Sequence, residues 1–312
     1  MIGVMMQGNQ LGPSGQPSSR RHGLVQMVDG LPPGLLVLLS ILSIQISSAI
    51  ATFLFVDLGP AGTTACSTLF AALALTVTVR PRFDRRLIRH GVLLLAFGLT
   101  ETCLVLPFFL SLQYISLGIA STISFCGPLG LAVISSRRPI DFLWIAIAVT
   151  GVVLMTPMGG GELNPTGLLL AGLSAVAWAI FVLLVKRLGG IFSGNEGLTF
   201  GMWSACLFLL PLAWHEGSLL AVSQHGFASI SALAGAGLVA LLNVVLPLSL
   251  EFKALQRMSA RYYGILMTLE PAIGAIIGLI WLGQGIDLRT SLAICCVTLA
   301  ALGVTLTESR RS

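Results

Sequence analysis

The sequence predicts an all-α integral membrane protein with ten transmembrane helices, arranged as two inverted five-helix repeats with both termini in the cytoplasm. This prediction rests on composition, on ten apolar stretches and on the one-sided placement of Lys and Arg. Only 9% of the 312 residues are charged and the mean hydropathy is +0.95, whereas a soluble protein carries about 25% charged residues. This composition excludes a cytosolic enzyme, a nucleic-acid-binding module and a disordered chain.

Ten stretches are long and apolar enough to cross a bilayer, which takes about 20 residues of helix. Residues 1–32, rich in Gly, Ser, Pro and Gln, are expected to form a mobile cytoplasmic tail. The first five stretches form one repeat (33–157) and the last five the other (166–307), before a short cytoplasmic C-terminus (308–312). The predicted spans are residues 33–56, 61–79, 91–113, 117–136, 140–157, 166–185, 198–214, 229–253, 261–283 and 288–307.

The distribution of Lys and Arg predicts the orientation of the chain. When the loops are taken in order, 16 of the 17 basic residues fall on one side of the membrane, and Arg289 falls on the other. Basic loops stay in the cytoplasm, so both termini are placed there. The pI near 9.1 is therefore interpreted as a topology signal and not as a nucleic-acid-binding surface.

An internal repeat at an offset of 143 residues supports the division into halves. It aligns Ser111–Ser116 with Ala254–Ser259, and Gly127-Pro128 with Glu270-Pro271. Two copies of a five-helix unit must cross the membrane in opposite senses, which gives the inverted repeat of many secondary transporters. Chance similarity between apolar segments is the alternative explanation.

Four prolines inside predicted spans, Pro107, Pro128, Pro247 and Pro271, indicate where helices are irregular. Each lacks a backbone N–H and disturbs its helix. Carbonyl groups freed at membrane depth are tolerated against protein or a water-filled cavity, so we expect these helices to line a central pocket. The last three of these prolines are candidates for its lining, and a plain packing kink is the alternative at each.

Glu270 is the first candidate for coupling to substrate and protons. It is about ten residues into the ninth predicted span, and a carboxylate at that depth is costly unless it is paired or hydrated. Gly274 and Gly278 follow on the same helix face, which indicates that this face packs against other helices. The alternative role is a structural carboxyl that bonds across a helix contact.

Further polar residues occur within the spans. Glu251 shares a helix face with Asn243 and Pro247 near the cytoplasmic end of the eighth span, where it either contributes to the site or pairs with a basic residue. Glu101 lies midway along the third span and is the third coupling candidate. Two lesser pocket-lining candidates are Gln45 and Trp178; a Trp at this depth also suits plain packing.

The sequence contains no pattern typical of catalysis or of metal or nucleotide binding. All six Cys lie in apolar stretches without His at ligand spacing, so neither a metal site nor a disulfide is expected. The four His lie in tails or loops, and Gly159-Gly160-Gly161 lacks the preceding strand and the Lys of a phosphate loop. We therefore expect no cofactor and no enzymatic activity.

Several motifs resemble the drug/metabolite transporter superfamily, EamA type, and in particular its threonine/homoserine exporter branch. The matching segments are residues 125–129, 135–142, 246–251 and 267–272. The resemblance implies a ten-helix inverted repeat that exports metabolites by alternating access. In that branch Arg and Glu stand where this chain has Ser67 and Ser124, and an apolar residue stands where it has Glu101, which implies an altered pocket lining.

Together these features predict a secondary active transporter of the inner (plasma) membrane that exports small amino-acid-like metabolites of the threonine/homoserine class by proton antiport. The expected partners are the small-molecule substrate, protons and the lipid bilayer, and no nucleic acid; the oligomeric state is not predicted. Efflux of cationic or aromatic drug-like compounds is the alternative, because three carboxylates occur in the spans without a deep base. A non-transporting membrane protein, such as a receptor, is the remote alternative.

Overall fold

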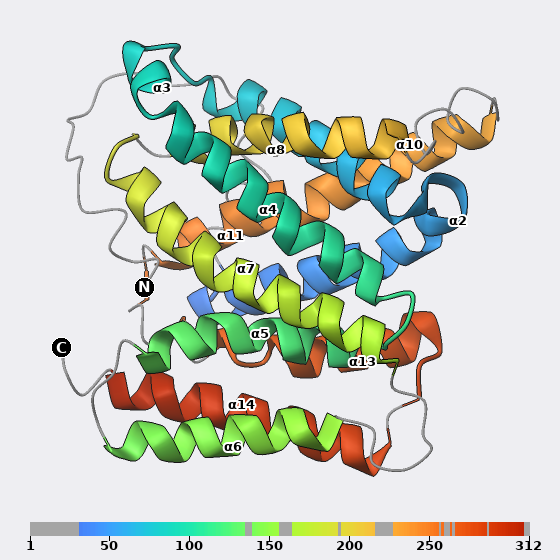
Figure 1. Ribbon diagram of the computed structural model, residues 1–312, viewed down its shortest axis with the longest axis vertical. Helices are drawn as coiled ribbons and strands as arrows, with labels where there is room; N and C mark the ends of the chain where they lie inside the picture. The colour runs from blue at the N-terminus through green and yellow to red at the C-terminus, as the bar shows by residue number, and fades with distance from the viewer. Residues whose placement is uncertain are drawn as a thin grey trace.

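The computed structural model is helical in every regular element that it describes (Figure 1). It describes residues 31–134, 139–155, 164–192, 195–215, 227–255, 257–258, 263, 266–285 and 287–308. Residues 1–30 of the predicted tail and residues 309–312 of the predicted C-terminus lie outside this part of the chain.

The elements follow one another along the chain with short connections. They are α2 (Pro33–Val79), α3 (Arg85–Arg89), α4 (Gly91–Ser111), α5 (Leu117–Ile134), α6 (Pro139–Met155), α7 (Pro165–Gly189), α8 (Glu196–His215), α10 (Phe227–Ala240), the π-helix η2 (Leu241–Val245), α11 (Leu246–Leu255), α13 (Glu270–Leu282) and α14 (Leu288–Glu308).

Several of these helices have the length and composition of membrane spans. Among the described residues, five helical stretches are long and apolar enough to cross a bilayer: Pro33–Val79, Gly91–Ser111, Pro165–Gly189, Glu196–His215 and Ile230–Glu251. Three shorter helices, Leu117–Leu131, Glu270–Leu282 and Leu288–Ala300, are also apolar. The prediction of an all-helical chain with several apolar helices is therefore confirmed for this part of the chain.

Helix α2 covers the first two predicted spans and consists of two arms that meet at a sharp bend (Figure 1). Gly59 forms the bend with φ 65° and ψ 168°, a conformation that favours glycine because a Cβ would clash there. Pro60 follows, and its preset φ and missing N–H suit the first turn of the second arm. The expected loop between the two spans is thus reduced to a bend at one residue.

The eighth predicted span is interrupted by the π-helix η2. Pro247 has no N–H and cannot donate a hydrogen bond to the carbonyl four residues earlier. The N–H of Leu246 bonds to the Leu241 carbonyl, five residues back, and not to the Leu242 carbonyl, four residues back. The neighbouring carbonyl of Leu242 accepts a hydrogen bond of 2.6 Å from Ser43 Oγ on α2. A side chain from another helix therefore satisfies the irregular backbone.

The ninth predicted span differs from the structure. The sequence predicts a continuous helix over 261–283, but α13 begins at Glu270, and Thr268 and Leu269 form a turn before it. Pro271 lies in the first turn, where its missing N–H costs no helical hydrogen bond. Glu270 is therefore not in the middle of a helix; it is the first residue of one.

The helices pack in pairs across the molecule. Figure 1 shows α6 beside α14 at one edge, with α5 and α13 next to them and α8 and α10 towards the opposite edge. Helix α4 packs on α7 and α8, and α2 packs on α8, α10 and α11. The largest apolar core joins residues of α2, α4, α5, α7, α10, α13 and α14, so the centre of the bundle is shared by both halves of the chain.

A substitution at Gly127 tests the close approach of α5 to α7. A Cβ added there would collide with the carbonyl oxygen of Ala175 on α7, so the neighbouring backbone would have to move. We expect Gly127→Ala to destabilise the protein by about 1–3 kcal/mol, seen as a lower unfolding temperature of the purified protein in detergent.

Gly130, on the same helix, supplies the control. No described atom lies within 4 Å of a Cβ added at Gly130, and alanine is the better helix former. Gly130→Ala should leave the unfolding temperature unchanged or raise it. Equal unfolding temperatures for the two variants would contradict the tight contact.

Candidate functional site

A cavity of about 310 Å³ lies at the centre of the bundle, a size suited to a small ligand. Side chains of α2, α4, α5, α7, α8, η2, α11 and α13 line it, together with Tyr263 and Met267. The elements with irregular backbone, η2 and the start of α13, are both part of its wall. Eight of the sequence-predicted site residues line this cavity: Gln45, Glu101, Ser124, Trp178, Asn243, Pro247, Glu251 and Glu270.

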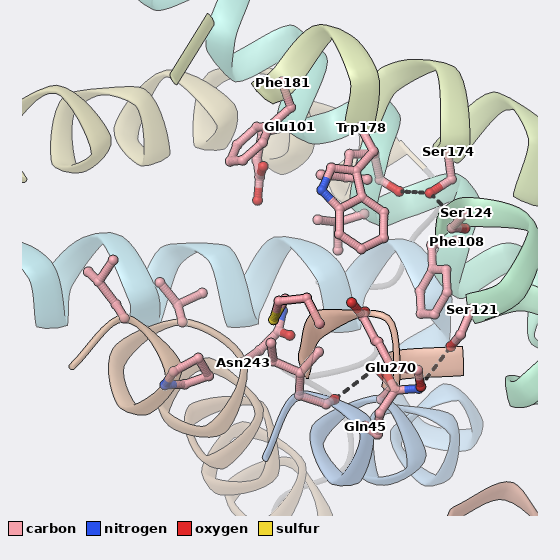
Figure 2. Close-up of a pocket in the computed structure, with 18 of the residues that line it drawn as sticks. Gln45, Glu101, Phe108, Ser121, Ser124, Ser174, Trp178, Phe181, Asn243 and Glu270 are labelled. Atoms are coloured by element: carbon pink, nitrogen blue, oxygen red, sulfur yellow. Dashed lines mark hydrogen bonds between the residues drawn. The ribbon is translucent and has the colours of Figure 1, made fainter. Parts of the chain in front are cut away.

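Glu270 lies against α2 and α5 at one side of the cavity (Figure 2). The Gln45 amide donates a hydrogen bond of 2.9 Å to Ser121 Oγ and one of 3.4 Å to the main-chain oxygen of Glu270. The side chain of Glu270 is 6% exposed, and its Oε2 has no hydrogen-bond partner among the described residues. This oxygen is therefore available to a donor that enters the cavity.

The glycines that follow Glu270 on α13 allow close packing, as the sequence predicts. A side chain at Gly274 would collide with the amide of Gln45 and crowd Ser121. One at Gly278 would collide with Gln284. The missing side chain at Gly274 thus makes room for the Gln45 amide between α5 and α13.

Glu251 is held by hydrogen bonds from two other segments. Ser40 Oγ on α2 donates to Oε1 at 2.6 Å, and the Tyr263 hydroxyl donates to Oε2 at 2.7 Å. Both carboxylate oxygens therefore have protein donors, in contrast to Glu270. The sequence left open whether Glu251 belongs to the site or to the interface, and it lines the cavity.

Glu101 lies on the opposite side of the cavity from Glu270, on α4 beside Phe181 of α7 (Figure 2). It is 7% exposed, and its Oε2 has no hydrogen-bond partner in the described part of the chain. Phe97, one turn earlier on α4, packs against Phe181 with ring centroids 5.1 Å apart. Glu101 thus has an aromatic neighbour in the cavity wall, Phe181.

Hydroxyl groups and an indole complete the wall formed by α4, α5 and α7. Ser174 Oγ donates to the Leu104 carbonyl at 2.9 Å, and Ser124 Oγ lies 3.4 Å from Ser174 Oγ. The indole of Trp178 packs edge-on against Phe125, with ring centroids 6.0 Å apart, and projects between the two sides of the cavity (Figure 2). Ser124 therefore belongs to a buried hydroxyl pair.

Ser67, Pro128 and Pro271 do not line this cavity. Ser67 is on the second arm of α2, and its hydroxyl donates to the Thr64 carbonyl of the same helix. Pro128 lies one turn beyond Ser124 on α5. Pro271 follows Glu270 directly, so these two neighbours point in different directions from the helix.

The structure also adds residues that the sequence analysis did not select: Phe108, Ser121, Ser174, Phe181 and Tyr263. Their types are common in apolar helices, and no spacing distinguishes them from packing residues. Ser121 and Ser174 are polar at membrane depth, which is a usable signal, but the serines and threonines in other spans carry the same signal.

The charged side chains of the cavity lining are all acidic. It contains three carboxyl groups, and no Lys, Arg or His lines the cavity in the described part of the chain. An acidic cavity with a few hydroxyl and amide groups favours an ammonium group or a proton over an anion. Its remaining walls are apolar and aromatic.

Comparisons with known proteins find similarity to membrane transporters. The model of the EamA-like transporter family matches residues 165–306. The threonine/homoserine exporter RhtA of Salmonella typhimurium (strain LT2) is 35% identical over 280 residues, which cover 89% of this chain and 92% of the exporter. RhtA of Escherichia coli (strain K12) is 34% identical over 282 residues, which cover 90% of this chain and 93% of the exporter.

A solved crystal structure is similar in fold. It aligns with 90% of this chain and 98% of its own chain at a TM-score of 0.53 and 16% identity, so the likeness concerns the fold alone. The similarity to the exporters extends over most of both chains, and it confirms the family suggested by the sequence motifs. The chain belongs to the EamA-like transporter family of the drug/metabolite transporter superfamily, and it is an integral membrane transporter rather than an enzyme.

Proposed function

We propose that the protein is a secondary active transporter of the inner (plasma) membrane that exports small amino-acid-like metabolites of the threonine/homoserine class by proton antiport. The observation that carries the proposal is the central cavity with Glu270 Oε2 buried and unpartnered at its wall. Similarity to threonine/homoserine exporters supports the substrate class.

The proposed architecture is the ten-span inverted repeat, with halves 33–157 and 166–307 and cytoplasmic tails 1–32 and 308–312. Helix pairing supports it. In the repeat, α4 corresponds to α10 and α11, and α7 corresponds to the first arm of α2. Helix α4 packs on α7, and α10 and α11 likewise pack on the first arm of α2. The offset of 143 residues found in the sequence also relates cavity positions on α4 to cavity positions in the second half. The pairs are Glu101 and Val244, Leu104 and Pro247, Val105 and Leu248, and Phe108 and Glu251.

In the proposed cycle, Glu270 binds either a proton or the ammonium group of the substrate. The carboxylate of the substrate accepts hydrogen bonds from Asn243 and from Ser121, whose hydroxyl accepts from Gln45 and retains its own hydrogen to donate. Since one carboxyl group cannot hold both cations at once, uptake of a proton releases the substrate. This exclusive binding is the physical basis of the exchange.

Alternating access requires that the two halves move around the cavity. The hydrogen bonds from Ser40 and Tyr263 to Glu251 join the first arm of α2 to α11 and to the segment before α13. We assign to this cluster the closure of one side of the cavity. Pro271 allows α13 to begin beside the cavity and so presents Glu270 at the helix start.

Efflux of cationic, aromatic compounds is the second candidate. The observation in its favour is a lining with three carboxyl groups, Trp178 and Phe181, and without a basic side chain in the described part of the chain. Aromatic faces and carboxylates both attract organic cations.

Counterflow distinguishes the two candidates. Proteoliposomes that contain the purified protein and unlabelled threonine or homoserine should take up the labelled amino acid. The same vesicles should not exchange cationic dyes, because a zwitterion satisfies both the acid and the donors of the cavity. Exchange of dyes without exchange of either amino acid would favour the second candidate, and the absence of all exchange would refute both.

Glu270→Gln tests the coupling. The amide cannot take up a proton, and the charge-assisted hydrogen bond to the ammonium is lost, so threonine flux driven by an imposed pH gradient should fall by about tenfold or more. Glu196→Gln is the control, because Glu196 lies at the start of α8 away from the cavity and accepts a hydrogen bond from the Arg82 N–H. Full proton-driven flux in the Glu270 variant would rule out this mechanism.

The topology has a separate test. A fluorescent protein that matures in the cytoplasm should be fluorescent when fused after Ser312, and an alkaline phosphatase fused there should be inactive. Phosphatase fused after Gly285, in the connection that precedes Arg289, should be active. The reverse result at either fusion point would contradict the cytoplasmic termini.

A further inference from the structure

Glu101 is a buried carboxyl group for which the cycle above needs no role. It lines the same cavity as Glu270, it is 7% exposed, and its Oε2 has no hydrogen-bond partner in the described part of the chain. A buried carboxyl group without a donor is costly in an apolar environment. Something that enters the cavity must therefore supply the missing donor when Glu101 is ionised.

The surroundings of Glu101 define the chemistry of that donor. Phe181 lies beside it in the cavity wall, and Trp178 projects into the cavity between Glu101 and Glu270 (Figure 2). Aromatic faces attract cations and offer nothing to an anion. A carboxylate among aromatic rings is therefore suited to an alkylammonium group, whose methylene carbons pack on the rings while its N–H groups bind the carboxylate.

The two unpartnered carboxyl groups lie on opposite sides of one cavity. Glu101 comes from α4, and Glu270 comes from the start of α13 beside Gln45 (Figure 2). A ligand that bonds to both must carry a positive group at each end. A single metal ion does not fit this arrangement, since no group of three or more His, Cys, Asp or Glu among the described residues is close enough together to hold one.

We propose that Glu101 forms a second ammonium-binding subsite and that the cavity therefore accepts diamino acids and diamines in addition to monoamino acids. This proposal rests on the proposed transport function and specifies its substrate class. The α-ammonium binds at Glu270, as in the monoamino acids, and the side-chain ammonium extends past Trp178 to Glu101. A monoamino acid such as threonine leaves the Glu101 subsite without an ammonium ligand.

Calorimetric binding to the full-length protein in detergent tests the subsite directly. The probes are L-lysine and 1,4-diaminobutane, with L-threonine as the ligand that does not reach Glu101. We expect Glu101→Gln to weaken binding of lysine and of diaminobutane by about tenfold or more, because one charge-assisted hydrogen bond is lost. Threonine binding should be unchanged, and Glu101→Asp, which keeps the charge, should retain part of the affinity for lysine.

Asp57→Asn is the matched control, because it removes one carboxylate at an exposed position outside the cavity lining and should alter none of the three affinities. Equal weakening of lysine and threonine by Glu101→Gln would overturn the proposal, as would a wild-type protein that binds neither lysine nor diaminobutane. Threonine binding by Glu101→Gln shows that the variant is folded. Failure of threonine counterflow would contradict the transport function, whereas selective loss of lysine binding would still establish the subsite.

Discussion

The absence of water inside a bilayer is the constraint on which this structure depends. A backbone group exposed to lipid has no hydrogen-bond partner, so the chain can leave regular helix at membrane depth only where protein or a polar cavity receives it. The irregular segments obey this rule. The π-helix Leu241–Val245 has its Leu242 carbonyl bonded to Ser43, and the turn before α13 is closed by the N–H of Leu269 bonded to the Leu266 carbonyl. Both segments border the cavity.

The same constraint applies to the buried carboxyl groups, which also need hydrogen-bond donors. The buried amide of Gln45 is satisfied by protein partners, since it donates hydrogen bonds to a hydroxyl of α5 and a carbonyl of α13. Glu251 likewise has a donor for each oxygen. Glu101 and Glu270 each have one oxygen without a partner in the described part of the chain, although both are buried. The hydroxyls of Ser47 and Thr298 are also buried without a partner among the described residues, but of these four atoms only the two carboxyl oxygens belong to residues that line the cavity. The proposed function places a ligand or a proton at these two oxygens.

Sequence reasoning reaches the fold class and the acidic residues because both follow from local rules. Low charge and long apolar stretches indicate a helical membrane protein, and a Glu at membrane depth is unusual wherever it occurs. The late start of α13 was missed because Pro271 suits either a kink within a helix or the first turn of one. The partners of Glu251 were missed for a different reason: Ser40 is 211 residues away, and no local pattern predicts which distant hydroxyl meets a given carboxylate.

In the proposed internal repeat, the two halves share a scaffold but not the chemistry of the cavity. The offset of 143 residues pairs Glu101 with Val244, Glu251 with Phe108 and Glu270 with Gly127, so each acid corresponds to a residue without charge. At Gly127 the missing side chain lets α5 approach the backbone of Ala175, whereas α13 begins at Glu270. One half thus uses this position for packing and the other for charge. Because no acid is paired with another acid by the repeat, the three acids are not related by its two-fold symmetry. A ligand in the cavity therefore meets an asymmetric arrangement of charge.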